Sequence, residues 1–318
     1  MKFRRLGNSE IEISSIILGM WQAGKKMWAG IDDRESTLAV KTALDEGINT
    51  FDTAELYGNG HSERILGAAL EGSREKVIYA TKVSPRHLSY SQVIRACHRS
   101  MKNLKTDYID LYQIHWPSGS WGTKEVPIEE TMNAMNRLKE EGKIRAIGLS
   151  NFSRLQVEEA SLYGEIQSVQ LPYSIFWRHI EKDVTSFCAE NSLSILAYSS
   201  MAQGILTGKF GEGHIFDEKD HRSRNRLFSP SVFPRVQDAL ERLRPIARRN
   251  HITLGQLALG WVISHSNTCA IAGARNSKQV SQNSRAVNVF LSAGDLNEID
   301  LISRQVTDLI GEDPVMWK

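Results

Sequence analysis

The sequence from residue 49 to residue 58 reads Asn49-Thr50-Phe51-Asp52-Thr53-Ala54-Glu55-Leu56-Tyr57-Gly58. β-Branched and aromatic residues open this stretch as a short strand. A polar turn follows that holds an acid, Asp52, and five residues later a tyrosine, Tyr57. Catalytic groups of parallel barrels stand at the carboxyl ends of strands and on the loops that follow. The stretch therefore predicts the start of an active site on a barrel rim; the alternative is that Asp52 caps a turn and Tyr57 packs beneath it.

Short apolar runs alternate with helical patterns on both sides of this stretch. Strands are expected over residues 15–19, 49–52, 77–82, 108–115, 144–150, 168–171, 193–199 and 269–272. Helices are expected over 32–47, 61–70, 89–104, 127–141, 153–163, 180–191, twice between 234 and 264, and over 277–289 and 294–306. About eight strands alternating with helices favour an α/β fold, a closed parallel (β/α)₈ TIM barrel, over an open sheet.

Two features extend this barrel pattern at its ends. Residues 2–14 alternate apolar and polar around Gly7-Asn8-Ser9, which predicts an N-terminal β-hairpin that would plug the closed end of the barrel. The last helices lie beyond the eighth strand and are extra C-terminal helices. No linker interrupts the pattern, so we expect a single domain over residues 1–318.

Composition excludes several classes of protein. The 318 residues are 41% hydrophobic and 24% charged with a net charge of +2, which calls for neither a nucleic acid nor a membrane as partner. Three widely spaced cysteines, Cys97, Cys188 and Cys269, form no zinc motif, so we expect no metal site and buried thiols in a reducing compartment. No apolar run follows the N-terminus as a secretory signal would require, so the expected location is the cytoplasm.

Four ionisable residues converge on one point of the predicted barrel. Asp52, Lys82 and His115 each end a predicted strand, at separations of 30 and 33 residues, and Tyr57 lies just beyond the first of these ends. The set fits carbonyl reduction, in which hydride addition leaves charge on an oxygen that needs a proton. Tyr57 would give that proton, its pKa of about 10 lowered by Lys82. Asp52 would keep Lys82 charged, and His115 would orient the carbonyl.

These residues lie in segments that resemble the aldo-keto reductases. Residues 49–67 match the pattern NTFDTAxxYGxGxSExxLG, and Lys82 and His115 stand in TKV and QIHWP. The resemblance runs from Gly19 to Asn283 and is nearest to a bacterial branch with a short C-terminus, which includes proteins near inositol-catabolism genes and is related to potassium-channel β-subunits. It implies a catalytic tetrad of Asp52, Tyr57, Lys82 and His115.

The resemblance also implies where NADP(H) binds, because no GxGxxG of a Rossmann domain is present. The nicotinamide carboxamide would meet Ser150, Asn151 and Gln170. The ring and pyrophosphate would meet Gly19, Met20, Trp21, Asp52 and a segment resembling YSPLAxGxLTGK, in which Ser200 replaces proline: Tyr198, Ser199, Ser200, Met201, Ala202, Gln203, Gly204 and Lys209. Arg275 would meet the ribose 2′-phosphate. The adenosine would lie on a segment resembling GAxxxxQxxxN, with Gly273, Ala274, Gln279, Gln282 and Asn283.

Substrate contacts are expected from Trp21, Tyr57, His115 and Trp116, with Trp28 or Trp121 and the loop 210–233 as further candidates. Arg222, Arg224 and Arg226 in that loop either face solvent or fold over the cofactor phosphates. The first reading is an NADP-dependent reductase of small aldehydes or ketones. The second is a cofactor-binding regulatory subunit like the channel β-subunits, which carry asparagine where this chain has His115. A third is another barrel enzyme, such as a lyase. The sequence specifies neither substrate nor oligomeric state.

Overall fold

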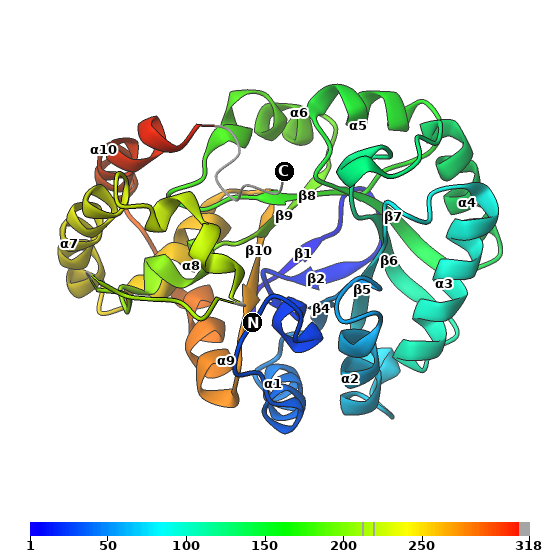
Figure 1. Cartoon of the computed structure of the whole chain (residues 1–318), viewed down its shortest axis with the longest axis horizontal. Coiled ribbons are helices and arrows are strands. Elements are labelled where there is room, and N and C mark those ends of the chain that lie inside the picture. The colour runs from blue at the N-terminus through cyan, green and yellow to red at the C-terminus, as the bar shows by residue number, and fades with distance from the viewer. Residues whose placement is uncertain (212, 219, 312–318) are drawn as a thin grey trace.

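A computed structural model describes residues 1–211, 213–218 and 220–311 of the chain. It confirms the barrel: eight parallel strands close in the order β10-β3-β4-β5-β6-β7-β8-β9 (Figure 1). The strands are β3 (Ile16–Gly19), β4 (Thr50–Asp52), β5 (Ile78–Val83), β6 (Ile109–Ile114), β7 (Ile144–Ser150), β8 (Ser168–Pro172), β9 (Ser194–Tyr198) and β10 (Thr268–Gly273).

Helices surround the barrel on the outside (Figure 1). Their starts follow from capping side chains: Asp32 accepts hydrogen bonds from two backbone N–H groups of α1, and Ser153 forms a capping box with Gln156 at the start of α5. The helices are α1 (Asp33–Asp45), α2 (His61–Ala69), α3 (Tyr90–Leu104), α4 (Ile128–Glu140), α5 (Arg154–Ser161), α6 (Val184–Glu190), α7 (Phe233–Arg249), α8 (Leu254–Ser264), α9 (Ser277–Ser284) and α10 (Ala293–Ile310).

Three helix predictions were wrong in their extent. The helix predicted over 180–191 is a 3-10 turn, His179–Lys182, followed by α6, because Asp183 interrupts the helix with a non-helical φ of −153°. The helix predicted over 277–289 ends at Ser284 and continues as a 3-10 turn. The last helix continues to Ile310, four residues beyond the predicted 294–306, and a capping box between Ser292 and Asp295 starts it one residue earlier.

The predicted hairpin is present and covers the amino-terminal end of the barrel. It pairs β1 (Phe3–Arg5) with β2 (Glu12–Ser14). The Gly7 N–H donates to Ser194 Oγ at 2.9 Å, and the Asn8 N–H donates to Gln167 Oε1 at 2.8 Å. Ser194 begins β9 and Gln167 directly precedes β8, so the hairpin turn lies at the start of both strands. Gly7 has φ 56°, and a Cβ there would lie 2.5 Å from the Gln167 carbonyl oxygen, so the close approach requires glycine.

Apolar side chains fill the barrel above the hairpin. The hairpin contributes Leu6, Ile11 and Ile13, and the barrel strands contribute Ile17, Ala80, Leu111, Ala146, Leu196, Cys269 and Ile271. The amino-terminal end is thus closed, and a ligand must enter from the carboxyl ends of the strands.

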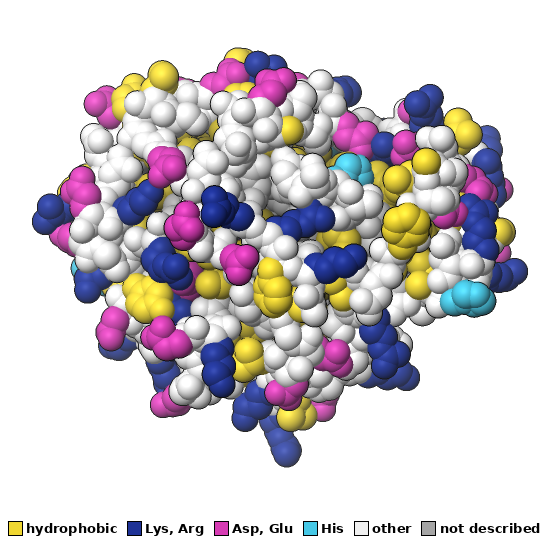
Figure 2. Space-filling view, turned by 180° about the vertical axis from the view of Figure 1, so that it is seen from behind, with side chains coloured by type: hydrophobic (Ala, Val, Ile, Leu, Met, Phe, Trp, Pro, Cys, Tyr) yellow, Lys and Arg dark blue, Asp and Glu magenta, His cyan; other side chains and the backbone are white. Residues whose placement is uncertain are grey.

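On the face seen in Figure 2, basic and acidic side chains are interspersed with hydrophobic ones. Among the described residues, none of the helices combines the length and apolar composition needed to cross a bilayer. Cys97, Cys188 and Cys269 are buried free thiols, as predicted.

Candidate active site

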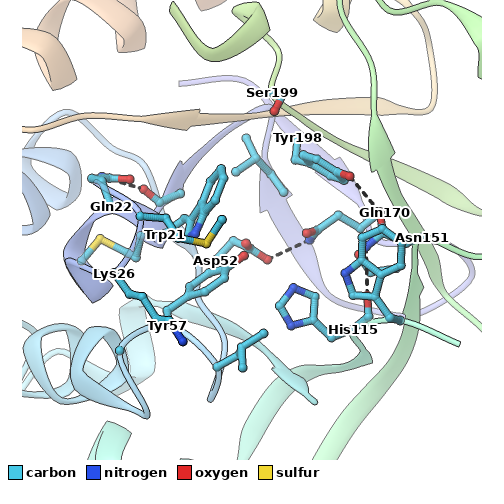
Figure 3. Close-up of a pocket in the computed structure, with 18 of the residues that line it drawn as sticks. Trp21, Gln22, Lys26, Asp52, Tyr57, His115, Asn151, Gln170, Tyr198 and Ser199 are labelled. Atoms are coloured by element: carbon cyan, nitrogen blue, oxygen red, sulfur yellow. Dashed lines mark hydrogen bonds between the residues drawn. The ribbon is translucent and has the colours of Figure 1, made fainter. Parts of the chain in front are cut away.

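The four residues predicted to converge do lie together at the carboxyl end of the barrel. Figure 3 shows three of them, Asp52, Tyr57 and His115. Asp52 is the last residue of β4, Lys82 lies near the end of β5, and His115 directly follows β6. Lys82 Nζ lies 2.6 Å from Asp52 Oδ1 and 3.5 Å from Tyr57 Oη. The Tyr57 and His115 rings meet edge to face, with centroids 5.6 Å apart.

Asp52 and Lys82 form a fully enclosed ion pair. Lys82 is 0% exposed and Asp52 is 3% exposed. Lys82 also donates to the Thr53 carbonyl oxygen at 2.8 Å, while Asp52 Oδ2 accepts from Gln170 Nε2 at 2.8 Å and from Gln113 Nε2 at 3.3 Å. Burial lowers the pKa of Lys82, and the Asp52 carboxylate opposes that shift. Each charge therefore has its partner inside the protein.

Gln113 was not among the predicted site residues. It lies in β6 two positions before His115, and side chains two apart in a strand point to the same face. A polar residue at an inward position of a buried strand was the available signal. Its amide oxygen accepts from Gln170 Nε2 at 3.2 Å, so the two glutamines brace each other and Asp52.

The prediction that Lys82 lowers the pKa of Tyr57 was wrong for this structure. Burial by the surrounding protein raises the pKa of Tyr57 well above its ordinary value, and the Asp52 carboxylate adds to the increase. The reason is geometric, because the Lys82 ammonium contacts Asp52 closely and the phenol oxygen only at 3.5 Å. Tyr57 is thus a protonated phenol, the form that can donate a proton.

His115 is a buried, neutral imidazole. Burial and the Lys82 charge lower its pKa well below the usual value near 6.5. Its Nδ1 atom is buried and has no hydrogen-bond partner in the part of the chain that the structure describes. The backbone carbonyl of His115 accepts from Asn151 Nδ2 at 2.9 Å, which ties the residue after β6 to the residue after β7. His115 lines the cavity beside Tyr57, where it can meet a ligand.

A cavity of about 350 Å³ opens over these residues (Figure 3). Trp21, Trp116 and Trp121 line it, as the sequence indicated for the first two. Trp28 does not line it; its ring stands edge-on to Trp21, with centroids 5.1 Å apart. Of the residues predicted to bind cofactor, those lining the cavity are Gly19, Met20, Trp21, Asp52, Ser150, Asn151, Gln170, Tyr198 and Ser199. Lining residues that sequence reasoning missed are Gln22, Lys26, Met27, Leu56, Gly58, Arg86 and Ile271.

The loop 210–233 was expected in the pocket wall, but none of its described residues lines the cavity. It instead supports the loop 20–32 from outside. The His221 ring packs on Trp21 with centroids 4.6 Å apart, and the backbone N–H of His221 donates to the Met27 carbonyl oxygen at 3.2 Å. The loop therefore acts on the pocket through Trp21.

Ser150, Asn151 and Tyr198 form one hydrogen-bonded group at the ends of β7 and β9, on either side of β8. Tyr198 Oη donates to Asn151 Oδ1 at 2.8 Å, and Asn151 Nδ2 lies 3.0 Å from Ser150 Oγ. Asn151 has φ 64°, a left-handed conformation that asparagine tolerates better than most residues. The structure thus assembles an amide and a hydroxyl where the carboxamide contact was predicted.

The segment after β9 is a tight turn with an unusual backbone. Ser199, Ala202, Gln203 and Gly204 all have positive φ, at 52°, 47°, 56° and 96°. Ser200 is buried, and its Oγ donates to the Ala197 carbonyl oxygen at 2.7 Å. The hydroxyl ties the turn back to β9 at the position where the family pattern has proline, so the loop remains anchored without the proline ring.

A cluster of three cations lies where β10 ends. Lys209, Arg222 and Arg275 are close enough that burial and their mutual repulsion lower the pKa of Lys209 and of Arg275. Both guanidinium groups lie over the Trp28 ring, at 4.9 Å for Arg222 and 5.6 Å for Arg275. Asp220 is the acid in contact with the cluster, and it pairs with Arg222 Nε at 2.8 Å.

The three loop arginines lie in different environments. Arg222 is buried beside Arg275, whereas Arg224 is exposed and Arg226 donates to the Ile310 carbonyl oxygen at 3.0 Å. Arg275 Nη2 is buried without a hydrogen-bond partner among the described residues. Three cations with one carboxylate and an unpaired guanidinium nitrogen form a site suited to an anion.

The segment from Gly273 to Asn283 is held by side-chain amides. Gln279 Oε1 accepts the Arg275 N–H at 2.8 Å, and Asn283 Nδ2 donates to the Gly273 carbonyl oxygen at 3.3 Å. Gln22 Nε2, which sequence reasoning missed, donates to the Ala274 carbonyl oxygen at 2.8 Å. The Gln282 carbonyl accepts from Gln256 Nε2. Two of the predicted adenosine residues thus also shape the backbone of their own segment.

The family model for the aldo/keto reductase family matches residues 15–304. The chain belongs to the aldo/keto reductase family. The match spans the barrel, the four converging residues and the cation cluster.

Several family members resemble this chain over nearly their whole length. Aldo-keto reductase YhdN of Bacillus subtilis is 34% identical, with 98% of this chain and 97% of the relative covered. An NADH-specific methylglyoxal reductase of Escherichia coli is also 34% identical, covering 93% and 96%. A probable voltage-gated potassium channel subunit beta of Arabidopsis thaliana is 30% identical, covering 91% and 92%, which confirms the expected relation to that branch.

Solved structures agree with the fold. A glycerol dehydrogenase from Gluconobacter oxydans superposes with a TM-score of 0.88 at 31% identity, covering 96% of each chain. An aldo-keto reductase from Klebsiella pneumoniae, crystallised in complex with NADPH, has a TM-score of 0.77 at 31% identity and covers 95% of each chain.

Proposed function

We propose that this aldo/keto reductase uses NADPH to reduce aldehyde or ketone groups of small molecules to alcohols, with Tyr57 as general acid. The observation that carries the proposal is the placement of the Tyr57 phenol in the cavity, 3.5 Å from the buried Lys82 ammonium. Burial keeps that phenol protonated, so it is ready to give a proton rather than to take one.

The roles of the other residues follow from their contacts. When bound, NADPH supplies the hydride. Tyr57 Oη gives its proton to the carbonyl oxygen as charge develops there, and the Lys82 ammonium stabilises the phenolate that remains. Asp52 holds Lys82 in place through the 2.6 Å contact. His115, neutral and lining the cavity, orients the carbonyl oxygen by hydrogen bonding.

The cofactor preference rests on the cation cluster. NADPH differs from NADH by a ribose 2′-phosphate that carries nearly two negative charges, and forked guanidinium groups suit its oxygens. Lys209, Arg222 and Arg275 offer such charge, and Asp220 is the acid among the described residues that acts on Lys209 and Arg275. One relative was crystallised with NADPH and another is named NADH-specific, so family membership alone leaves the choice to these residues.

A second candidate is a cofactor-binding regulatory subunit with little turnover. It is favoured by the 30% identity to a probable potassium channel subunit beta. His115 and a complete tetrad support the enzyme, since a regulatory subunit needs neither the proton donor nor the group that orients a carbonyl.

Turnover tests the proposal directly. Purified protein should oxidise NADPH in the presence of members of a panel of aldehydes, ketones and sugars. Tyr57→Phe should lower kcat by at least about 10²-fold while NADPH still binds, the loss expected for a missing general acid. Tyr90→Phe, which removes an exposed phenol from α3, is the matched control and should leave kcat unchanged. Wild-type turnover in Tyr57→Phe would remove Tyr57 from the mechanism.

A further inference from the structure

A second cavity, of about 640 Å³, adjoins the catalytic pocket. It is a groove between the loop after β4, the loop after β5 and helices α2 and α3. Leu56 and Arg86 line both cavities, so the groove begins at the wall of the catalytic pocket. Leu56 also directly precedes Tyr57 in the chain. A molecule whose carbonyl lies at Tyr57 can therefore extend past Arg86 into the groove.

The groove is strongly positive. Four cationic side chains and one carboxylate line it, a formal excess of three positive charges with His87 neutral: Arg64, Arg86, Arg99, Lys102 and Glu55. Glu55 is already committed, because it accepts from the Ser84 N–H at 2.7 Å and from Arg99 Nη2 at 3.1 Å, and contacts His87 Nδ1 at 2.8 Å. Within the described ranges, Arg64, Arg86 and Lys102 have no ion-pair partner.

The same sign of charge continues to the mouth of the catalytic pocket. Lys26 lines that pocket and has no ion-pair partner in the described part of the chain. In Figure 3 its side chain lies on the same side of the pocket as Tyr57, across from Asn151 and Tyr198. The only carboxylate among the described lining residues of the pocket is Asp52, which is bound to Lys82. No acid there offsets Lys26 or Arg86.

These cations are separate from those expected to meet the cofactor phosphate. Lys209, Arg222 and Arg275 line neither the pocket nor the groove. Binding of the cofactor therefore does not account for the charge around Arg86. A positively charged cleft that leads to a reactive centre raises the local concentration of anionic ligands.

We propose that the natural substrate of this enzyme is a small aldehyde or ketone that carries an anionic group, which Arg86 and the groove bind while the carbonyl lies at Tyr57. This inference rests on the proposed reductase function and specifies its substrate class. The shared chemistry is a phosphoryl or carboxylate group that accepts hydrogen bonds from a guanidinium fork. Several cations around one groove match a phosphate dianion better than a single carboxylate.

Matched substrate pairs test the inference. One pair is glyceraldehyde and glyceraldehyde 3-phosphate; the other is butyraldehyde and succinic semialdehyde, which differ by a carboxylate. With NADPH, the anionic member of at least one pair should have a kcat/KM about 10-fold or more above its neutral partner, the size of a charge-assisted contact. The pair that shows the preference identifies the anion. Added salt should reduce the ratio, since the groove is open to solvent.

Variants tie the preference to the groove. In Arg86→Ala/Lys102→Ala the ratio of anionic to neutral kcat/KM should fall below about 3-fold. Arg95→Ala removes one positive charge from α3 at an exposed position that lines neither cavity, and should leave the ratio unchanged. Equal kcat/KM within each pair in the wild type, or a preference that survives in the double variant, would overturn the inference while neutral aldehydes still show the reductase. Absence of turnover with every carbonyl would overturn both.

Discussion

Lys82 and the cluster of Lys209, Arg222 and Arg275 both carry positive charge at the carboxyl end of this barrel. The two differ in how far acidic side chains of the protein balance that charge. Lys82 lies 2.6 Å from Asp52 and donates a second hydrogen bond to the Thr53 carbonyl, wholly inside the protein. Lys209, Arg222 and Arg275 have Asp220 among them, and Arg275 Nη2 has no partner among the described residues. Burial and repulsion from Arg222 lower the pKa of Arg275, whereas at Lys82 the lowering of the pKa by burial is opposed by Asp52.

The difference distinguishes the buried Lys82–Asp52 pair, which holds reacting groups in place, from the cation cluster, which is suited to bind an anionic ligand. A buried charge with an internal partner is held in one geometry, and removing either partner exposes the other to a desolvation cost. A cation cluster with too few acids is stabilised when an anion binds, so the charges of the cluster contribute to the affinity for that anion. Mutation of the buried pair should therefore change mainly the free energy of unfolding, whereas mutation of the cation cluster should change mainly the affinity for a ligand.

The largest effect is expected from breaking the buried pair. Lys82→Met should lower the free energy of unfolding by about 3–5 kcal/mol, because Asp52 is left as an uncompensated buried carboxylate. Urea denaturation measures this. Asp52→Asn/Lys82→Met removes both charges and should recover most of the loss. A single variant as stable as the wild type would show that Asp52 does not depend on Lys82.

A smaller effect, on affinity rather than stability, is expected at the cation cluster. Arg275→Ala should weaken NADPH binding by about 10- to 150-fold, the value of a charge-assisted contact of about 1.5–3 kcal/mol, and leave NADH nearly unchanged. Quenching of tryptophan fluorescence reports both cofactors, and exposed Arg224→Ala is the control. The free energy of unfolding of Arg275→Ala should stay within about 1 kcal/mol of the wild type. Equal losses for both cofactors, or tight NADH binding by the wild type, would contradict the assignment.

The smallest effect concerns the protonation of His115. Its pKa is depressed in the folded protein, so below about pH 6.5 the unfolded chain binds a proton that the folded chain does not. The associated stability is complete above that pH and decreases as pH falls, by at most about 1.4 kcal/mol per unit. His115→Asn should flatten the dependence of unfolding free energy on pH between 7 and 5. An unchanged slope would show that another group titrates.

The sequence predicted the charged pair more fully than the cluster, for a physical reason. Strand ends in a closed parallel barrel must converge, so the positions of Asp52, Lys82 and His115 followed from strand spacing alone. Tyr57 was placed correctly, but the direction of its pKa shift was wrong, since burial depends on packing that spacing does not reveal.

The convergence of strand ends does not determine where side chains on loops lie. Arg222, Arg224 and Arg226 alternate along the chain, and only the 3-10 turns that fold the loop place Arg222 inside while Arg226 reaches α10. Gln22 acts through an amide hydrogen bond to the Ala274 carbonyl, far along the chain, which no local pattern marks. Gln113 was marked only by its inward position in a buried strand. The groove around Arg86 likewise draws on four separate segments and was not foreseen.

Single-turnover reduction tests the central claim most directly. Wild type and Tyr57→Phe are each saturated with NADPH, mixed with a carbonyl substrate that the wild type reduces, and followed by the loss of NADPH absorbance. Because cofactor is already bound, the rate reports the chemical step rather than affinity. The rate in Tyr57→Phe should be lower by at least about 10²-fold. A rate within about threefold of the wild type would contradict the assignment of Tyr57 as the proton donor.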